Sequence, residues 1–234
     1  MIAVPPPHTD QHLTPWFFDC DGVLLDSNAA KTKAFAAVVA DYGNDAADRL
    51  VSHHVQNAGV SRFEKFAWFF PNVLQREPHP GEIKELIHRF GQQCTRELQD
   101  CRREPHGAEL LARLSETGRQ LHVVSGGLEA EVTASLTAHG LAQHFTSVNG
   151  SPRTKAQILS DVRRLNPEGL HGVFVGDSRH DMEVAADFGL RRVFVSQWSD
   201  FADWQLYVAA NPDILVVNDL QQLAALVESV DSGR

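Results

Sequence analysis

The 234-residue sequence has little of what marks secreted or membrane-spanning proteins. Its three cysteines, Cys20, Cys94 and Cys101, are an odd number, and their spacing fits neither a disulfide framework nor a zinc site. No apolar run is long enough to cross a bilayer. The first residues lack the basic and then apolar segments of a secretory signal. These absences favour a reduced, cytoplasmic protein without a membrane partner.

The sequence also has fewer basic than acidic residues. Lysine and arginine number 21 against 30 acidic residues, which gives a net charge of −9. Such a balance argues against nucleic acid or an anionic membrane as the main partner. The twelve histidines include no H-E-x-x-H pattern, and we assign none of them as a metal ligand.

The stretch from Trp16 to Ser27, W-F-F-D-C-D-G-V-L-L-D-S, is the most informative part of the sequence. Its aromatic run is typical of a buried strand and ends in Asp19 and Asp21, directly before Gly22. Side chains two residues apart share one face of a strand, so both carboxylates would face one site. A divalent cation with oxygen ligands, such as Mg²⁺, would relieve their repulsion. On these residues alone, the alternative that both acids cap a turn and a helix stays open.

Residues 29–104 carry helical patterns and no strand signal. The expected helices span 29–42, 45–56, 61–70 and 81–103. Ser61 and Glu64 match a capping box, and Pro71 is expected to end the third helix. The fourth helix would place Cys94 and Cys101, seven residues apart, on one face.

From residue 106 onward, expected helices and strands alternate. The strands are expected at 121–124, 145–148, 172–175, 193–196 and 214–217, and the helices at 108–117, 128–139, 154–165, 179–188 and 220–227. This alternation predicts an α/β fold with a doubly wound parallel sheet covered on both faces, whose ligands bind beyond the carboxyl ends of the strands. The predicted strands that precede Asp19, Ser125 and Asp177 all end in polar or acidic residues beside glycine.

The domain organisation follows from these two patterns. We expect residues 16–28 and 105–234 to form a Rossmann-like core, and residues 29–104 to form an all-helical cap inserted after the first strand. Residues 1–15, with three consecutive prolines, would be a flexible extension.

Four motifs in this order resemble those of the haloacid dehalogenase-like (HAD) superfamily. They are F-D-C-D-G-V-L-L-D-S, V-V-S-G-G, the lysine of S-P-R-T-K-A-Q-I-L, and V-F-V-G-D-S-R-H-D, over Trp16 to Asp181. The helical insertion is similar to the small cap of its β-phosphoglucomutase and phosphoglycolate phosphatase-like members. The third motif departs from the usual Lys-Pro-x-Pro signature, so Arg153 competes with Lys155 as its basic residue.

The resemblance implies a role for each motif residue. Asp19 would be the nucleophile that forms an aspartyl-phosphate, and Asp21 the general acid and base. Ser125, the amide of Gly126 and Lys155 would bind the phosphoryl group.

The resemblance also implies a magnesium site. Mg²⁺ would be held by Asp19, by Asp21 through its backbone carbonyl, by Asp177, and by Asp181 directly or through water.

Each of these residues also has a plainer interpretation. Ser125 could cap a helix and Lys155 could be a surface residue, while Asp177 and Asp181 could be a cap and a surface acid. We also expect Asp26 and Ser27 to cap the first helix of the insertion rather than to contact substrate.

Two basic residues of the insertion carry a hypothesis about the substrate. Arg62 and Lys65 lie three residues apart and so on one helix face. We expect this face to turn toward the site and bind a second anionic group, although a solvated basic face is the alternative. Lys31 stands where the mutases have a histidine that serves their phosphoryl cycle, which favours hydrolysis.

The sequence therefore predicts a Mg²⁺-dependent phosphatase that hydrolyses a small phosphate monoester, such as a sugar phosphate. The alternatives are a phosphomutase of the β-phosphoglucomutase type and a phosphate-binding module without turnover. We expect the cap to open and close about hinges near residues 27–30 and 103–106. Monomer and dimer both remain open.

Overall fold

A six-stranded, all-parallel sheet organises the computed structural model, which describes residues 14–98, 101–165 and 170–231. The strand order is β3-β2-β1-β4-β5-β6. The strands are β1 (Trp16–Phe18), β2 (Leu121–Leu128), β3 (Ser147–Ser151), β4 (Val173–Gly176), β5 (Arg191–Val195) and β6 (Leu215–Val217). In the centre, Phe17 of β1 lies in register with His122 and Phe174. The strand that precedes Asp19 is therefore central. Only residues 14 and 15 of the expected extension lie among the described residues.

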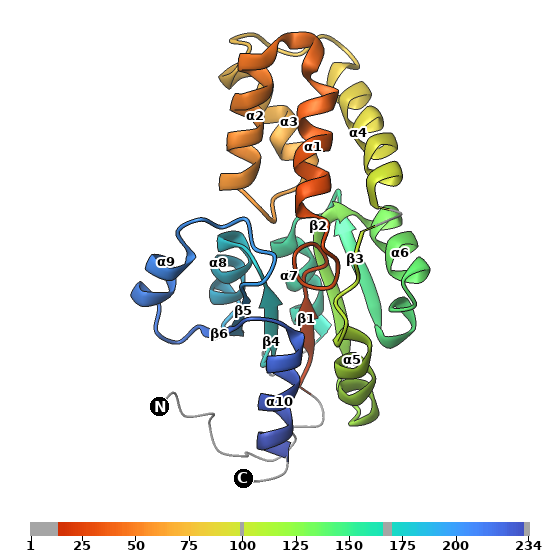
Figure 1. Ribbon diagram of the computed structural model, residues 1–234, viewed down its shortest axis with the longest axis vertical. Helices are drawn as coiled ribbons and strands as arrows, with labels where there is room; N and C mark the ends of the chain where they lie inside the picture. The colour runs from red at the N-terminus through yellow and green to blue at the C-terminus, as the bar shows by residue number, and fades with distance from the viewer. Residues whose placement is uncertain (1–13, 99–100, 166–169, 232–234) are drawn as a thin grey trace.

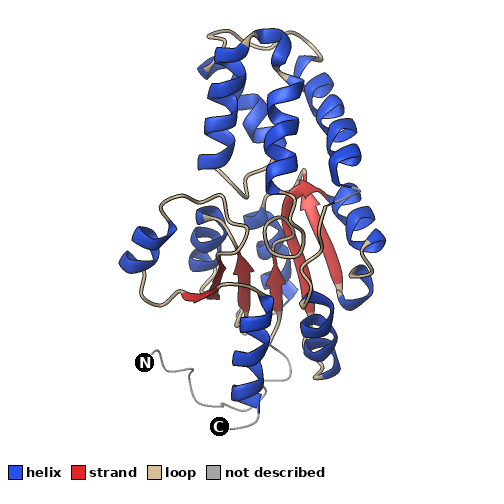
Figure 2. Ribbon diagram, viewed as in Figure 1, coloured by secondary structure: helices blue, strands red, loops and turns tan. Residues whose placement is uncertain are grey.

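Four helices stand together beyond the carboxyl ends of the strands, and the others flank the sheet (Figures 1 and 2). The first group, called the four-helix layer below, comprises α1 (Asn28–Val38), α2 (Asn44–Gln56), α3 (Arg62–Asn72) and α4 (Glu82–Leu98). The second group comprises α5 (Gly107–Glu116), α6 (Glu129–Ala138), α7 (Lys155–Leu165), α8 (Arg179–Asp187), α9 (Trp204–Ala210) and α10 (Leu220–Asp231). No described helix is both long and apolar enough to cross a membrane.

Alternating side chains of the short strand β1 supply both faces of the sheet. Trp16 and Phe18 join the apolar cluster that α5, α6 and α10 cover, together with Leu110 and Leu223. Phe17 points the other way, into a second cluster with residues of α7 and α8. Burial on both faces explains why β1 reads as an uninterrupted aromatic run. The doubly wound α/β fold predicted from the sequence is confirmed.

The four-helix layer has an apolar core of its own. Phe35, Phe66, Phe69, Phe70 and Phe90 are buried in it. The rings of Phe35 and Phe90 lie 4.3 Å apart between centroids. These residues belong to none of the clusters beneath, so the layer packs as a separate unit above the strand ends.

Some expected boundaries are wrong. Helix α3 continues through Pro71 to Asn72, although Pro71 was expected to end it. Helix α4 is described to Leu98, and residues 99–100 lie outside the described residues. Beyond that gap the chain is extended, because Arg102 and Glu104 bond to the backbone of Asp26 and Leu24. Cys101 therefore lies off the helix and does not share a helix face with Cys94.

Two further elements in the second half of the chain differ from expectation. Strand β3 begins at Ser147 instead of Phe145, because a short 3₁₀ turn at Ala142–His144 precedes it. Helix α9 was not predicted, since its seven residues are too few to show a clear period. Trp204 fixes this helix by packing its ring against Phe194 of β5, with centroids 5.5 Å apart.

We expect Leu159→Ala to lower the free energy of unfolding by about 2–5 kcal/mol, because it leaves a cavity in the core. Leu159 is fully buried under the sheet. Leu206→Ala is the matched control, since Leu206 is 73 % exposed on α9 and the change should stay within about 0.5 kcal/mol. Urea denaturation measures both, and equal losses would contradict this assignment of the core.

Candidate active site

Carboxylates gather where the two central strands end. Asp19 directly follows β1, Asp177 directly follows β4, and Asp181 lies in the first turn of α8. These three side chains are at most 3 % exposed. One carboxylate oxygen of each lies within 4.8 Å of those of the other two. Parallel pairing of β1 with β4 therefore brings Asp19 and Asp177 together, as expected for these two strand ends, and α8 adds Asp181.

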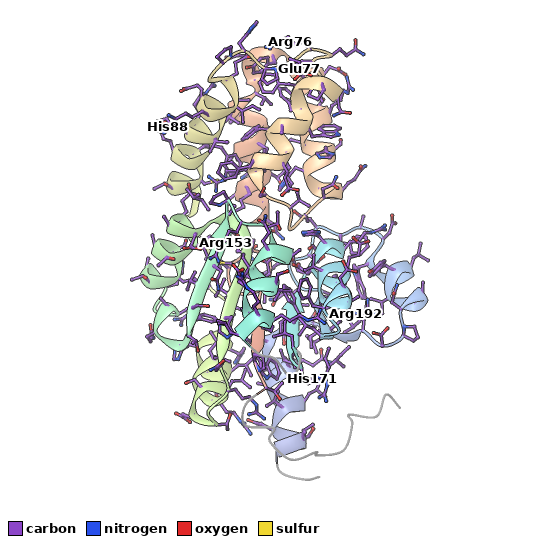
Figure 3. All side chains as sticks on the ribbon, turned by 180° about the vertical axis from the view of Figure 1, so that it is seen from behind. Arg76, Glu77, His88, Arg153, His171 and Arg192 are labelled. Carbon is purple, nitrogen blue, oxygen red and sulfur yellow. The ribbon has the colours of Figure 1, made fainter. Side chains whose placement is uncertain are left out.

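Lys155 is the basic residue of this cluster. Its Nζ lies 2.9 Å from Oδ2 of Asp19 and 2.5 Å from Oδ1 of Asp181, and its side chain is buried. The alternative that Lys155 is a surface residue is wrong. Arg153 lies on the preceding turn, where it binds Glu129 and Asn149 at the back of the molecule (Figure 3).

Burial dominates the electrostatics of the cluster. It raises the pKa of Asp19 to about 7, against the attraction of Lys155 and with the repulsion of Asp181. Burial, and next Asp181, raise the pKa of Asp177 well above its ordinary value. Burial alone would lower the pKa of Lys155, but Asp181 and Asp19 outweigh it and raise that pKa. The protein thus holds acids close together at a cost, which is typical of functional sites.

The donor set of this cluster suits a hard divalent cation. Three buried carboxylates share one buried ammonium, so the described groups carry excess negative charge when they are ionised. Carboxylate oxygens are the ligands that Mg²⁺ prefers. The Asp181 oxygens already accept hydrogen bonds, Oδ1 from Lys155 and Oδ2 from the hydroxyl of Ser178 at 2.6 Å. Asp181 is both a member of the acidic cluster and part of the capping box of α8.

Asp21 faces a different set of partners. Its carboxylate accepts a hydrogen bond of 2.5 Å from the hydroxyl of Ser27 and forms an ion pair with Lys31. Burial alone would raise the pKa of Asp21, but Lys31 and Ser27 outweigh it, so that this pKa lies below its ordinary value. Ser27 occupies the N-cap position of α1, but its hydroxyl does not cap the helix, so the expected capping role is wrong. Asp26 instead pairs with Arg102.

A tight turn at Gly22 follows Asp21, and beyond it Asn28 contacts the site. The sequence did not reveal this role of Asn28. Gly22 has a φ of 74°, and a Cβ there would overlap the carboxylate of Asp177. Asn28 donates from Nδ2 to Oδ2 of Asp177 at 2.9 Å and to the carbonyl of Trp198 at 2.8 Å. Asn28 directly follows Asp26 and Ser27, which have the pattern of a helix cap. Because of this pattern, the sequence did not suggest a contact between Asn28 and Asp177.

Ser125 and Gly126 lie within β2, which continues to Leu128. The N-cap of α6 is Leu128, so the alternative that Ser125 caps this helix is wrong. Ser125 is buried, and its Oγ accepts a hydrogen bond of 3.0 Å from the amide of Gly127. A Cβ on Gly126 would overlap the carbonyl oxygen of Gly59, which belongs to the loop between α2 and α3. Glycine here lets the four-helix layer approach the strand ends.

A cavity of about 50 Å³ lies between the sheet and the four-helix layer. Asp19, Asp21 and Asp177 line it from the sheet side. The residues of the layer that line it include Lys31, His54, Arg62 and Lys65.

Arg62 and Lys65 therefore lie at the site, as expected. They are 4 % and 2 % exposed, so the alternative of a solvated basic face is wrong. The guanidinium of Arg62 binds both oxygens of Glu131 on α6, at 2.9 and 2.5 Å. Glu131 was not foreseen, because no local pattern links it to α3.

Comparisons with known proteins support the fold. Two similar structures are described as a predicted phosphoglycolate phosphatase from Haemophilus somnus and a predicted phosphatase from Clostridium acetobutylicum. The first is 20 % identical with a TM-score of 0.69, and covers 94 % of this chain and 100 % of that one. The second is 18 % identical with a TM-score of 0.71, and covers 93 % and 99 %. At these identities the likeness shows the fold alone.

A third similar structure, CbbY from Rhodobacter sphaeroides in complex with phosphate, is 20 % identical with a TM-score of 0.60 and covers 78 % of this chain and 86 % of that one. No curated protein matches the sequence. The family model for haloacid dehalogenase-like hydrolases matches residues 16–195, which include every residue of the acidic cluster. The chain belongs to the haloacid dehalogenase-like hydrolase family.

Proposed function

We propose that the protein is a Mg²⁺-dependent phosphatase that hydrolyses a small phosphate monoester, such as a sugar phosphate, through an aspartyl-phosphate. One observation carries the proposal. Asp19 is buried against Lys155 beside two further carboxylates, and Asp21 lines the same cavity from two residues away. The phosphatase names of structural neighbours, and the phosphate bound to one of them, support it.

The first step forms a bond between a carboxylate oxygen of Asp19 and phosphorus, while the ester P–O bond breaks. Asp21 would deliver a proton to the departing alkoxide, for which its carboxyl group must first be protonated and leave the ion pair with Lys31. In the second step water attacks phosphorus, Asp21 takes up its proton, and the carboxylate of Asp19 is released. Ser27 and Lys31 hold Asp21 beside the cavity between these proton transfers.

The negative charge of the phosphoryl group needs hydrogen-bond donors and positive charge around it. Ser125, the amide of Gly126 and Lys155 would hold its oxygens, which fits the burial of both side chains.

Asp19, Asp177 and Asp181 would hold the cation. Asp21 would contribute only its backbone carbonyl, in keeping with the binding of its carboxylate to Lys31. The bound Mg²⁺ would neutralise charge on the phosphoryl oxygens as Asp19 approaches.

The four-helix layer would shield the cavity from bulk solvent during the reaction. We propose residues 29–104 as a cap domain, and residues 16–28 and 105–234 as the core. The chain passes between the two near Leu25 and Arg103, which form a β-bridge. Hinges at residues 27–30 and 103–106 would let product leave, and the bridge would keep the two crossings together.

The two alternatives have less support. A phosphomutase would need its intermediate captured by a second hydroxyl, and Lys31 is held in an ion pair with Asp21 where mutases have a histidine. A module that only binds phosphate has no use for a second acid such as Asp21 beside the cavity. Turnover with and without a bisphosphate activator separates hydrolysis from mutase chemistry.

Asp19→Asn should abolish phosphate release from an aryl phosphate, by at least about a thousandfold, because the amide cannot form the covalent intermediate. Release by the unaltered protein should require magnesium. Asp203→Asn, an exposed acid on the loop before α9, is the matched control and should keep full activity. Undiminished, magnesium-independent release in the Asp19 variant would contradict the proposed nucleophile.

Magnesium should stabilise the folded protein, because it binds only where the three carboxylates are assembled; at 100 times its Kd the gain is about 2.7 kcal/mol. Asp177→Asn should weaken this gain, which calorimetry measures as a smaller rise in Tm on adding magnesium chloride. Without magnesium the variant should melt at or above the wild-type temperature, because one buried acid is gone. An identical magnesium response in both proteins would remove Asp177 from the site.

A further inference from the structure

Three basic side chains of the four-helix layer line the cavity, namely Lys31, Arg62 and Lys65. They differ in whether a carboxylate balances their charge. Lys31 pairs with Asp21, and Arg62 pairs with Glu131 through two hydrogen bonds. Within the part of the chain that the structure describes, Lys65 forms an ion pair with no carboxylate. Its Nζ lies 2.8 Å from Nδ1 of His54, a neutral partner.

The surroundings of Lys65 make this arrangement costly. The side chain is 2 % exposed and belongs to α3, whose neighbouring residues Phe66, Phe69 and Phe70 are fully buried. Its Nζ lies 5.5 Å from the ring centroid of Phe35, which also contacts His54. A buried ammonium without an opposite charge is destabilising, so packing does not explain a lysine here.

Burial, and next the charge of Lys31, lower the pKa of Lys65 to about 7. Burial, and next Lys65, lower the pKa of His54 to about 2, so the imidazole is neutral. Its Nδ1 accepts from the ammonium, and the remaining N–H donors of Lys65 have no described partner. An anionic group beside Lys65 would both accept from these donors and balance the charge.

We propose that Lys65, positioned by His54, binds a second oxyanion of the substrate. The proposal rests on the phosphatase function above and adds the substrate class, namely small phosphate monoesters that carry a further carboxylate or phosphate. Arg62 does not serve this role, because Glu131 already occupies its guanidinium; it joins the four-helix layer to α6 instead.

The two sides of the cavity carry opposite charges and would bind different parts of the substrate. Asp19 and Asp177 lie on the sheet side, and Lys65 lies on α3 on the other side. A substrate would therefore place its reacting phosphate at the carboxylates and its second anion at the lysine. The second anion would bind fully only when α3 lies over the sheet, so it would also favour closure of the layer.

Three esters of the same two-carbon length test the proposal. Ethyl phosphate has no second anion, 2-phosphoglycolate has a carboxylate, and ethylene glycol bisphosphate has a phosphate. We expect kcat/KM to be at least about 10-fold higher for one anionic ester than for ethyl phosphate, or about 1.4 kcal/mol. Which of the two is preferred identifies the second group as carboxylate or phosphate.

Lys65→Met should reduce this preference to about one, because it keeps most of the length of the side chain and removes its charge. Lys33→Met on the exposed face of α1 is the matched control and should keep the wild-type ratio. Lys65→Gln replaces the methionine variant if that variant melts below the assay temperature. A preference that survives removal of Lys65, or that is absent from the wild type, overturns the proposal.

Calorimetric binding to Asp19→Asn separates this inference from the proposed function. Tighter binding of an anionic ester that disappears with Lys65, combined with no hydrolysis by the wild type, would support the subsite and refute the phosphatase. Hydrolysis of all three esters at equal kcat/KM would support the phosphatase and refute the subsite. Failure to bind any of the three esters would overturn both.

Discussion

Three buried carboxylates around one ammonium are the arrangement on which the rest of the site depends. Asp19, Asp177 and Asp181 repel one another at the ends of strands that bury them, and Lys155 offsets only part of that charge. Like charges stay together in a low-dielectric place only if the fold fixes them there. Parallel pairing of β1 with β4 does so for the first two, and the capping box of α8 does so for the third. The core beneath therefore supplies the free energy that holds a high-energy site in place.

The second constraint is contact between the four-helix layer and the strand ends. The carbonyl of Gly59 lies so close to Gly126 that any side chain there would push the layer away. Arg62 and Glu131 add a charge-assisted contact across the same boundary. This contact brings Lys65 over the carboxylates of the sheet, and so the chemistry of the cavity depends on how the two layers meet.

The sequence predicted those residues of the site that local patterns identify. Asp19 and Asp177 follow apolar strands, and parallel topology brings such positions to one edge, so the acidic cluster was predictable. Asn28 and Glu131 were not, because each acts through a partner more than sixty residues away that no local spacing reveals. The same limit explains Cys101, whose helical period was overridden by backbone pairing of its neighbours with residues 24–26.

Lys65 shows why a breach of the packing rules is informative. A residue chosen for stability at this position of α3 would be apolar like Phe66, since the site is buried and the polar partner of Lys65 among the described residues, His54, is neutral. Natural sequences satisfy local and global preferences together except where function requires otherwise. Lys31 and Arg62 obey the rule, because each has a carboxylate in the closed structure. Among the described residues, Lys65 is thus the cation of the cavity without a carboxylate partner, and we propose that its partner is the substrate.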